Sequence, residues 1–242
     1  MHSVIVTGAS RGLGLGIARQ LKSAGYQVIA IARKETSQLL SAIQESEGSG
    51  SIHFVPFDLS EIEKIPDLLK AIRKQFGPVY GLVNNAALGT DGVLALMRNS
   101  QIEQLVRLNT VSPIVLTKYA VRSMIADGGG RIVNIASIIA STGYSGLSVY
   151  AATKASMLGF ARSLAREVGK MGVTVNSVAP GFVDTEMTQT LAVEKREQIV
   201  RRSALRRLVD IDDVAAAVEF LLSPKAKNIT GTVLTVDAGN TA

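Results

Sequence analysis

The sequence predicts a single α/β domain in which seven parallel strands form one doubly wound sheet flanked by helices. Short runs rich in valine and isoleucine alternate seven times with longer stretches of helical period. Most of these runs are apolar throughout, as expected of strands covered on both faces. The 242 residues show no composition break, repeat or linker, so one domain, residues 1–242, accounts for the chain.

The strand-like runs and the helix signals between them justify each element in turn. The expected strands are Ser3–Thr7, Gln27–Ala32, Ile52–Phe57, Val79–Val83, Arg131–Ala136, Val173–Ala179 and Thr232–Val236. After the first strand, Leu13, Ile17 and Leu21 recur every four residues. Gly25 then stands where a left-handed helix cap is expected.

Three further helices have recognisable ends or breaks. Residues 60–63, Ser-Glu-Ile-Glu, form the pattern of a capping box that opens a helix toward Phe76. Pro113 lies inside a long helical region, residues 102–124, and should kink or interrupt it. Asp210 or Asp212 can cap the last helix, which Ser-Pro at 223–224 should stop.

Composition excludes several classes of function. The chain has no cysteine, which excludes disulfides, thiolate metal sites and cysteine nucleophiles, and His2 and His53 are too scattered for a metal cluster. Net charge is +6, yet tryptophan is absent and aromatics are 5%, which gives little support to nucleic-acid binding. Neither a secretory signal nor an apolar run of membrane-spanning length occurs. These features predict a cytoplasmic protein without metal.

A glycine-rich loop joins the first expected strand to the first helix. It runs from Thr7 to Gly14, with further glycines at positions 8 and 12. This spacing allows a tight turn, close approach of the backbone to a pyrophosphate and close helix–strand packing. The helix start then presents unpaired N–H groups and a positive dipole end to the phosphates. Its place between strand and helix favours a dinucleotide site over a merely structural turn.

The end of the second strand indicates which dinucleotide binds. An acidic residue there would accept a hydrogen bond from a ribose 2′-hydroxyl, whereas a basic one accommodates a 2′-phosphate. The strand runs into Arg33 and Lys34 before the first acid, Glu35. Arg33 offers a planar fork suited to phosphate, and Arg11 in the glycine loop can reach the same group. We therefore expect NADP(H); the alternative is an ordinary solvated strand end.

Ser137, Tyr150 and Lys154 form a candidate catalytic group. Tyr150 and Lys154 are four residues apart, so they lie on one face of a helix. Ser137 closes the fifth strand, at the sheet edge where ligands bind in doubly wound folds. In a carbonyl reduction Tyr150 would be the general acid, and the nearby ammonium, together with the positive ring of the oxidised cofactor, would lower the pKa of the phenol from about 10. The alternative is an amphipathic tyrosine beside a surface lysine.

Five motifs, in this order and spacing, resemble those of the short-chain dehydrogenase/reductase family from Val4 to about Gly239. They are the glycine loop, Asn-Asn-Ala-Ala at 84–87, the serine after the fifth strand, the Tyr-x-x-x-Lys pair, and Pro-Gly-Phe-Val-Asp-Thr at 180–185. Ala87 stands where the family has glycine. The resemblance implies a Rossmann fold and oxidoreductase activity. It also implies that Asn109 is catalytic, because the family holds a water of the proton relay at that position.

The same resemblance implies contacts with the cofactor. Asp58 would touch the adenine, Lys154 the nicotinamide ribose, and Val183 with Thr185 the nicotinamide amide. The arginines at 11 and 33 resemble the NADP-preferring branch of the family. The implied cofactor contacts are Gly8, Ser10, Arg11, Gly12, Leu13, Gly14, Arg33, Asp58, Leu59, Asn85, Ala86, Ala87, Tyr150, Lys154, Pro180, Gly181, Val183 and Thr185.

Within the family the chain looks most similar to bacterial 3-oxoacyl-acyl-carrier-protein reductases. That resemblance implies NADPH-dependent reduction of a 3-oxoacyl thioester in fatty acid synthesis, an acyl carrier protein as partner, and a homotetramer. The loop at 126–130 and Met171 depart from it, because those enzymes often carry basic residues there. A reductase of another ketone, a coenzyme A thioester, a sugar or a polyol is the alternative, and a non-catalytic NADP-sensing protein a more remote one.

Residues 182–209 are expected to form a flap over the substrate, because they separate the sixth strand from the last helix. The segment holds six basic and four acidic residues, and four arginines gather between Arg201 and Arg207. Such a run is usually a solvated face. It could instead attract an anionic carrier.

Overall fold

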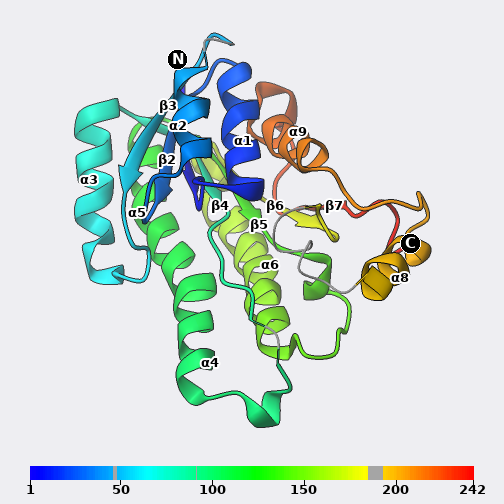
Figure 1. Cartoon of the computed structure of the whole chain (residues 1–242). Coiled ribbons are helices and arrows are strands. Elements are labelled where there is room, and N and C mark those ends of the chain that lie inside the picture. The colour runs from blue at the N-terminus through cyan, green and yellow to red at the C-terminus, as the bar shows by residue number, and fades with distance from the viewer. Residues whose placement is uncertain (46–47, 91, 185–192) are drawn as a thin grey trace.

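The computed structural model is a single α/β domain built on a seven-stranded parallel sheet (Figure 1), which confirms the predicted fold. It describes residues 1–45, 48–90, 92–184 and 193–242. The strand order is β3-β2-β1-β4-β5-β6-β7, and every pairing is parallel. The strands are β1 Ser3–Thr7, β2 Gln27–Ala32, β3 Ser51–Pro56, β4 Val79–Asn84, β5 Gly130–Ile135, β6 Val173–Pro180 and β7 Val233–Val236.

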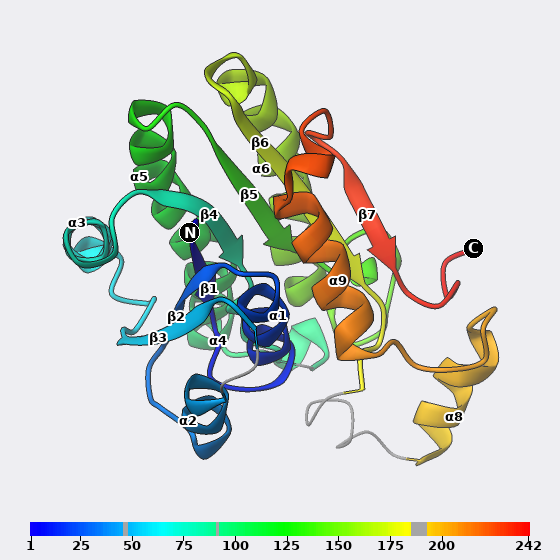
Figure 2. The ribbon, with the colours of Figure 1, turned by 90° about the horizontal axis from the view of Figure 1, so that it is seen from above.

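Helices cover both faces of the sheet, as the view from above shows (Figure 2). On one face lie α1 Gly12–Ser23, α2 Ser37–Gln44 and α9 Ile211–Leu222. On the other lie α3 Ile65–Phe76, α5 Ser112–Ala126 and α6 Ser148–Val168, and α4 Asn99–Val106 contacts α6. The helix α8, Val193–Arg202, lies beyond the β7 edge of the sheet (Figures 1 and 2).

The all-apolar strands divide their side chains between two cores. In β1, Val4 and Val6 point into the core under α1 and α9, whereas Ile5 points into the core under α3 and α5. All three side chains are fully buried. Alternation of side chains across a strand explains why a strand covered on both faces is apolar at every position.

Helix ends agree with the sequence signals at one place and differ at another. Gly25 follows α1 with φ +87°, and the N–H groups of Gly25 and Tyr26 donate to the carbonyls of Lys22 and Leu21, as in a Schellman motif. The prediction of a capping box at residues 60–63 is wrong. The hydroxyl of Ser60 donates to Asp58 (2.7 Å), and α3 begins only at Ile65, after a 3₁₀ turn.

Pro113 interrupts the long helical region, as predicted. A π-helical turn, Arg107–Val111, separates α4 from α5, and Pro113 occupies the first turn of α5. Proline has no N–H for the carbonyl of Asn109, four residues earlier, so the regular α-helical ladder cannot continue there. This turn buries the Asn109 side chain, which is 3% exposed.

Candidate active site

The candidate site lies at the carboxyl ends of β1, β4 and β5. The strand order reverses between β1 and β4, since β2 and β3 lie on one side and β5 to β7 on the other. Ligands of open α/β sheets bind at such a switch point. Thr7 ends β1, Asn84 ends β4 and Ser137 lies just beyond β5, so the motifs found along the sequence meet at one edge.

The glycine loop has the shape of a phosphate cradle. Gly8 and Gly12 have φ angles of +68° and +55°, which favour glycine. A Cβ atom on Gly14 would lie 2.2 Å from the carbonyl oxygen of Gly8, so any side chain would push α1 away from the loop. The first turn of α1 has no side-chain cap, so its N–H groups remain available to an anion. These features fit the pyrophosphate of a dinucleotide.

Thr7 and Asn85 hold this loop against the segment after β4. The hydroxyl of Thr7 accepts hydrogen bonds from the backbone N–H groups of Asn85 (2.9 Å) and Ala86 (3.0 Å) and donates to the carbonyl of Val83. The Asn85 amide donates to the carbonyl of Thr7 (2.8 Å) and more weakly to that of Gly8. Thr7 was not among the expected site residues, although its place at the end of β1 could have indicated it.

The residues expected at the adenosine end lie at the ends of β2 and β3. Hydrogen bonds from the backbone and hydroxyl of Ser60 lower the pKa of Asp58, and the charge of Arg33 contributes as well. Arg33 therefore lies close enough to Asp58 to act on it electrostatically. The side chains of Arg11 and Arg33 are exposed, whereas Leu59 is buried. Ser10 accepts a hydrogen bond from Thr36, which also caps α2.

The structure brings Ser137, Tyr150 and Lys154 together. The Ser137 hydroxyl accepts a hydrogen bond from the N–H of Ile139 (3.3 Å) and lies close enough to Tyr150 to lower the pKa of its phenol. Lys154 is 5% exposed, and its ammonium group donates to the carbonyl of Ile135 (2.8 Å). The same nitrogen lies 5.8 Å from the centre of the Tyr150 ring. A hydroxyl, a phenol and a buried ammonium thus converge where β5 meets α6.

The pKa values of this group differ from the expectation for Tyr150. Burial raises the pKa of the phenol to about 12, and the nearby Ser137 side chain offsets only part of that rise. Burial also lowers the pKa of Lys154 to about 8. We expected the ammonium to lower the phenol pKa; in the structure burial is the largest cause of the shift and raises it. Tyr150 therefore holds its proton firmly at neutral pH.

The buried side chain of Asn109 makes three hydrogen bonds. Its amide oxygen accepts from the N–H of Leu88 (2.8 Å), and its amide nitrogen donates to the Leu88 carbonyl (2.9 Å) and the Thr153 hydroxyl (3.2 Å). Thr153 in turn donates to the carbonyl of Tyr150 (2.7 Å). The side chain of Asn109 thus joins three segments of the site. Sequence reasoning missed Thr153 and Leu88.

The loop after β6 contributes from the other side. Pro180 ends β6, and the N–H of Gly181 donates to Val236 (2.9 Å). A Cβ atom on Gly181 would approach the Cα of Asp237 to 2.9 Å. Val183 is buried and forms a short parallel bridge with Val209. Thr185, the last expected cofactor contact, lies outside the described residues.

A groove begins beside Ser137. Its walls come from the segments after β5 and β6, from α8 and from the C-terminal segment. The lining residues are Ile138, Ile139, Thr142, Gly143, Tyr144, Phe182, Ile199, Arg202, Asn240 and Thr241. Apolar and polar side chains are mixed along it, which suits a ligand with both kinds of group.

Two other site types find no support in the described part of the chain. No helix there is long and apolar enough to cross a membrane. No cluster of three or more histidine, aspartate or glutamate side chains there could hold a metal ion.

A doubly wound sheet with a phosphate cradle at its switch point and a Ser-Tyr-Lys group beside it defines a dinucleotide-dependent oxidoreductase. Comparison with known proteins specifies the family. A family model described as enoyl-(acyl carrier protein) reductase matches residues 8–241. The chain belongs to the short-chain dehydrogenase/reductase family, whose members use a nicotinamide cofactor, and is an oxidoreductase acting on CH–OH or C=O groups.

Individual relatives agree with this assignment. The chain is 40% identical over 236 residues to the 3-oxoacyl-acyl-carrier-protein reductase FabG of Haemophilus influenzae, covering 97% of this chain and 96% of that protein. It is 39% identical to the FabG of Escherichia coli, covering 97% and 95%. A solved structure of a doubly mutated short-chain dehydrogenase/reductase from Serratia marcescens is 29% identical, with a TM-score of 0.92 over 100% of this chain and 98% of that one.

Proposed function

We propose that this protein is an NADPH-dependent reductase that converts 3-oxoacyl thioesters, carried on acyl carrier protein, to 3-hydroxyacyl thioesters in fatty acid synthesis. The observation that carries the proposal is the convergence of Ser137, Tyr150 and the buried Lys154 at the sheet edge that also carries the glycine cradle. Similarity to the FabG reductases over nearly the whole chain supports the choice of substrate class.

The cofactor, Ser137 and Tyr150 have different roles in the reduction. NADPH, held by the glycine loop and the segments after β2 and β4, would supply the hydride. The Ser137 hydroxyl donates a hydrogen bond to the substrate carbonyl oxygen and orients it toward Tyr150. Tyr150 then donates its proton to the oxygen as negative charge develops there. Its raised pKa means that the acid is fully protonated before the reaction begins.

Lys154 supports this step through its position rather than by direct transfer. Its ammonium is fixed by the carbonyl of Ile135 and lies beside the Tyr150 ring. A positive charge there stabilises the phenolate that Tyr150 becomes after giving up its proton. Asn109 and Thr153 hold the turn of α6 that carries Tyr150, so we assign them positioning roles.

The preference for NADPH rests on charge at the end of β2. Arg33 is exposed and reaches the neighbourhood of Asp58, and Arg11 stands at the start of α1. Guanidinium groups suit a 2′-phosphate, and no acid precedes Glu35 to accept a 2′-hydroxyl. We further propose that residues 182–209 form the substrate flap, with the short bridge between Val183 and Val209 as its base, and that the protein acts as a cytoplasmic homotetramer.

Assays of wild type and Tyr150→Phe on one panel of carbonyls test the proposal. Wild type should oxidise NADPH with acetoacetyl thioesters of acyl carrier protein, coenzyme A and N-acetylcysteamine. Tyr150→Phe should lose at least about a hundredfold in kcat, because general acid catalysis supplies roughly 10²–10⁴-fold. Its NADPH affinity should be unchanged. Turnover confined to a sugar or a simple ketone would contradict the thioester assignment, and tight NADPH binding without turnover would indicate a sensor.

A further inference from the structure

The end of α8 and the turn after it carry an exposed cluster of four arginines. This basic cluster consists of Arg201, Arg202, Arg206 and Arg207, and all four side chains are exposed. Between them the chain has no carboxylate. Among the described residues the only ion pair of the cluster joins Arg201 to Glu197 at 3.5 Å, with both side chains more than 60% exposed. Such a pair is largely screened by solvent. The cluster therefore presents nearly its full positive charge.

The backbone beneath the cluster is fixed. The Ser203 hydroxyl donates to the carbonyl of Ala238 (2.6 Å), as does the N–H of Leu205 (3.0 Å). The N–H of Ala204 donates to Gly239 (3.3 Å). A basic surface held in place by hydrogen bonds to the C-terminal segment loses little conformational freedom when a partner binds.

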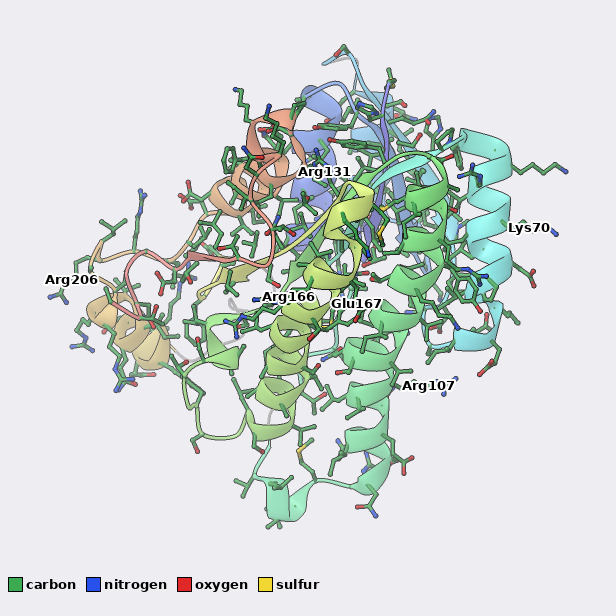
Figure 3. The ribbon with its side chains drawn as sticks, turned by 180° about the vertical axis from the view of Figure 1, so that it is seen from behind. Lys70, Arg107, Arg131, Arg166, Glu167 and Arg206 are labelled. Atoms are coloured by element: carbon green, nitrogen blue, oxygen red, sulfur yellow. The ribbon has the colours of Figure 1, made fainter. Side chains whose placement is uncertain are left out.

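The cluster also stands at one end of the candidate substrate groove. Arg202 lines the groove together with Ile199 and with Ile138, the residue after Ser137. A carrier bound to the cluster would therefore sit where its acyl chain can enter toward Ser137 and Tyr150. Figure 3 shows Arg206 at this end of the molecule, far from Lys70 on α3.

The segment at 126–130 offers no comparable surface. It contains one acid, Asp127, whose carboxylate forms an ion pair with Arg73 of α3 and accepts two hydrogen bonds from its guanidinium. The charge of Arg73 is thus neutralised by its own neighbour rather than presented to a partner. The α8 cluster is the basic surface next to the groove.

We propose that the basic cluster at the end of α8 docks the acidic surface of the acyl carrier protein while the thioester arm lies in the groove. This inference rests on the proposed function and adds the surface by which the carrier is recognised. A positive patch whose one described ion pair is screened by solvent raises the rate of encounter with an acidic partner and orients it, and the effect weakens with salt.

Charge reversal at two members that do not line the groove tests the docking. The variant Arg201→Glu with Arg207→Glu is compared with a matched control, Lys70→Glu with Lys74→Glu on α3, whose side chains are also exposed. Both are assayed with acetoacetyl thioesters of acyl carrier protein, coenzyme A and N-acetylcysteamine at 20 and 300 mM salt. For the carrier-protein substrate, we expect the cluster variant to lose about tenfold or more in kcat/KM at low salt and less at high salt.

The other substrates separate the outcomes. The small N-acetylcysteamine thioester should react equally with wild type, cluster variant and control, which also reports that the variants are folded. Equal losses with the carrier protein and coenzyme A would mean that the arginines bind phosphate, and would overturn protein docking. Equal losses with all three would mean a structural role, and no loss would also overturn the inference. Failure of wild type on every thioester would instead refute the proposed function.

Discussion

Replacing Asn109 by leucine should remove a buried clamp without creating a large cavity, since the two side chains are similar in size. Asn109 makes two hydrogen bonds with the backbone of Leu88 and one with Thr153. The substitution leaves the N–H and C=O of Leu88 without these partners. The Thr153 hydroxyl keeps its bond to the Tyr150 carbonyl, so it adds no further unsatisfied group.

The size of the effect follows from these groups. An unsatisfied buried donor or acceptor costs about 1–3 kcal/mol, so two of them cost about 2–6 kcal/mol. Leu88 is only half-buried, and water can reach part of its backbone. We therefore expect Asn109→Leu to lower the free energy of unfolding by about 2–4 kcal/mol. We also expect a lower kcat, because the clamp joins the segment after β4 to the helix that carries Tyr150.

Urea unfolding followed by far-ultraviolet circular dichroism measures the stability change. Thr153→Val, which keeps the shape of the side chain but not its hydroxyl, completes a double-mutant cycle with Asn109→Leu, and Thr153→Ser is the control that keeps the hydroxyl. The two changes should be non-additive by at least about 0.5 kcal/mol, since the side chains are bonded to each other. Asn109→Leu within about 0.5 kcal/mol of wild type, or a fully additive cycle, would refute the clamp.

Three other predictions test the cradle, the buried lysine and the cofactor. Gly14→Ala should abolish NADPH binding because its Cβ would meet the Gly8 carbonyl at 2.2 Å. Gly159→Ala, on α6 with open space around it, should instead raise the free energy of unfolding by about 0.5–1 kcal/mol. Titration with NADPH measures cofactor binding by both variants, and urea unfolding measures their stability. The pKa of Lys154 is about 8 in the folded protein and about 10.5 in the unfolded chain, so the unfolded chain binds more protons between these two pH values. The free energy of unfolding of wild type should therefore rise with pH over this range relative to that of Lys154→Met, which lacks the titrating group. Arg33→Asp should shift the ratio of kcat/KM values from NADPH toward NADH, and an unchanged ratio would contradict the role of Arg33.

The strands could be predicted closely because their signal is local. A strand buried on both faces needs an apolar side chain at every position, and β1 and β2 begin and end where the sequence indicated. The capping box at residues 60–63 failed for an equally physical reason. Asp58, two residues earlier, accepts both the N–H and the hydroxyl of Ser60, so Ser60 is already bonded when the chain reaches α3.

The candidate site was predictable where its residues follow one another along the chain and not where distant segments meet. Tyr150 and Lys154 share one helix face, and the glycine loop is continuous. The clamp, by contrast, joins Asn109 to Leu88, 21 residues away, and to Thr153, 44 residues away. No pattern in the sequence predicts that a π-helical turn will bury the Asn109 amide between these segments. The burial results from how the segments pack in three dimensions.

Burial is also what reverses the expected balance of proton affinities at the site. A lysine four residues from a tyrosine suggests an acidified phenol, yet the structure raises the Tyr150 pKa to about 12 and lowers that of Lys154 to about 8. Both shifts have desolvation as their largest cause, which penalises phenolate and ammonium alike. In the direction of reduction this arrangement has the proton already on the residue that must donate it. In the direction of oxidation Tyr150 must first lose that proton, and each pKa unit above the working pH costs about 1.36 kcal/mol. Alcohol oxidation should therefore gain rate as the pH rises, up to about pH 8, where Lys154 begins to lose the charge that stabilises the phenolate.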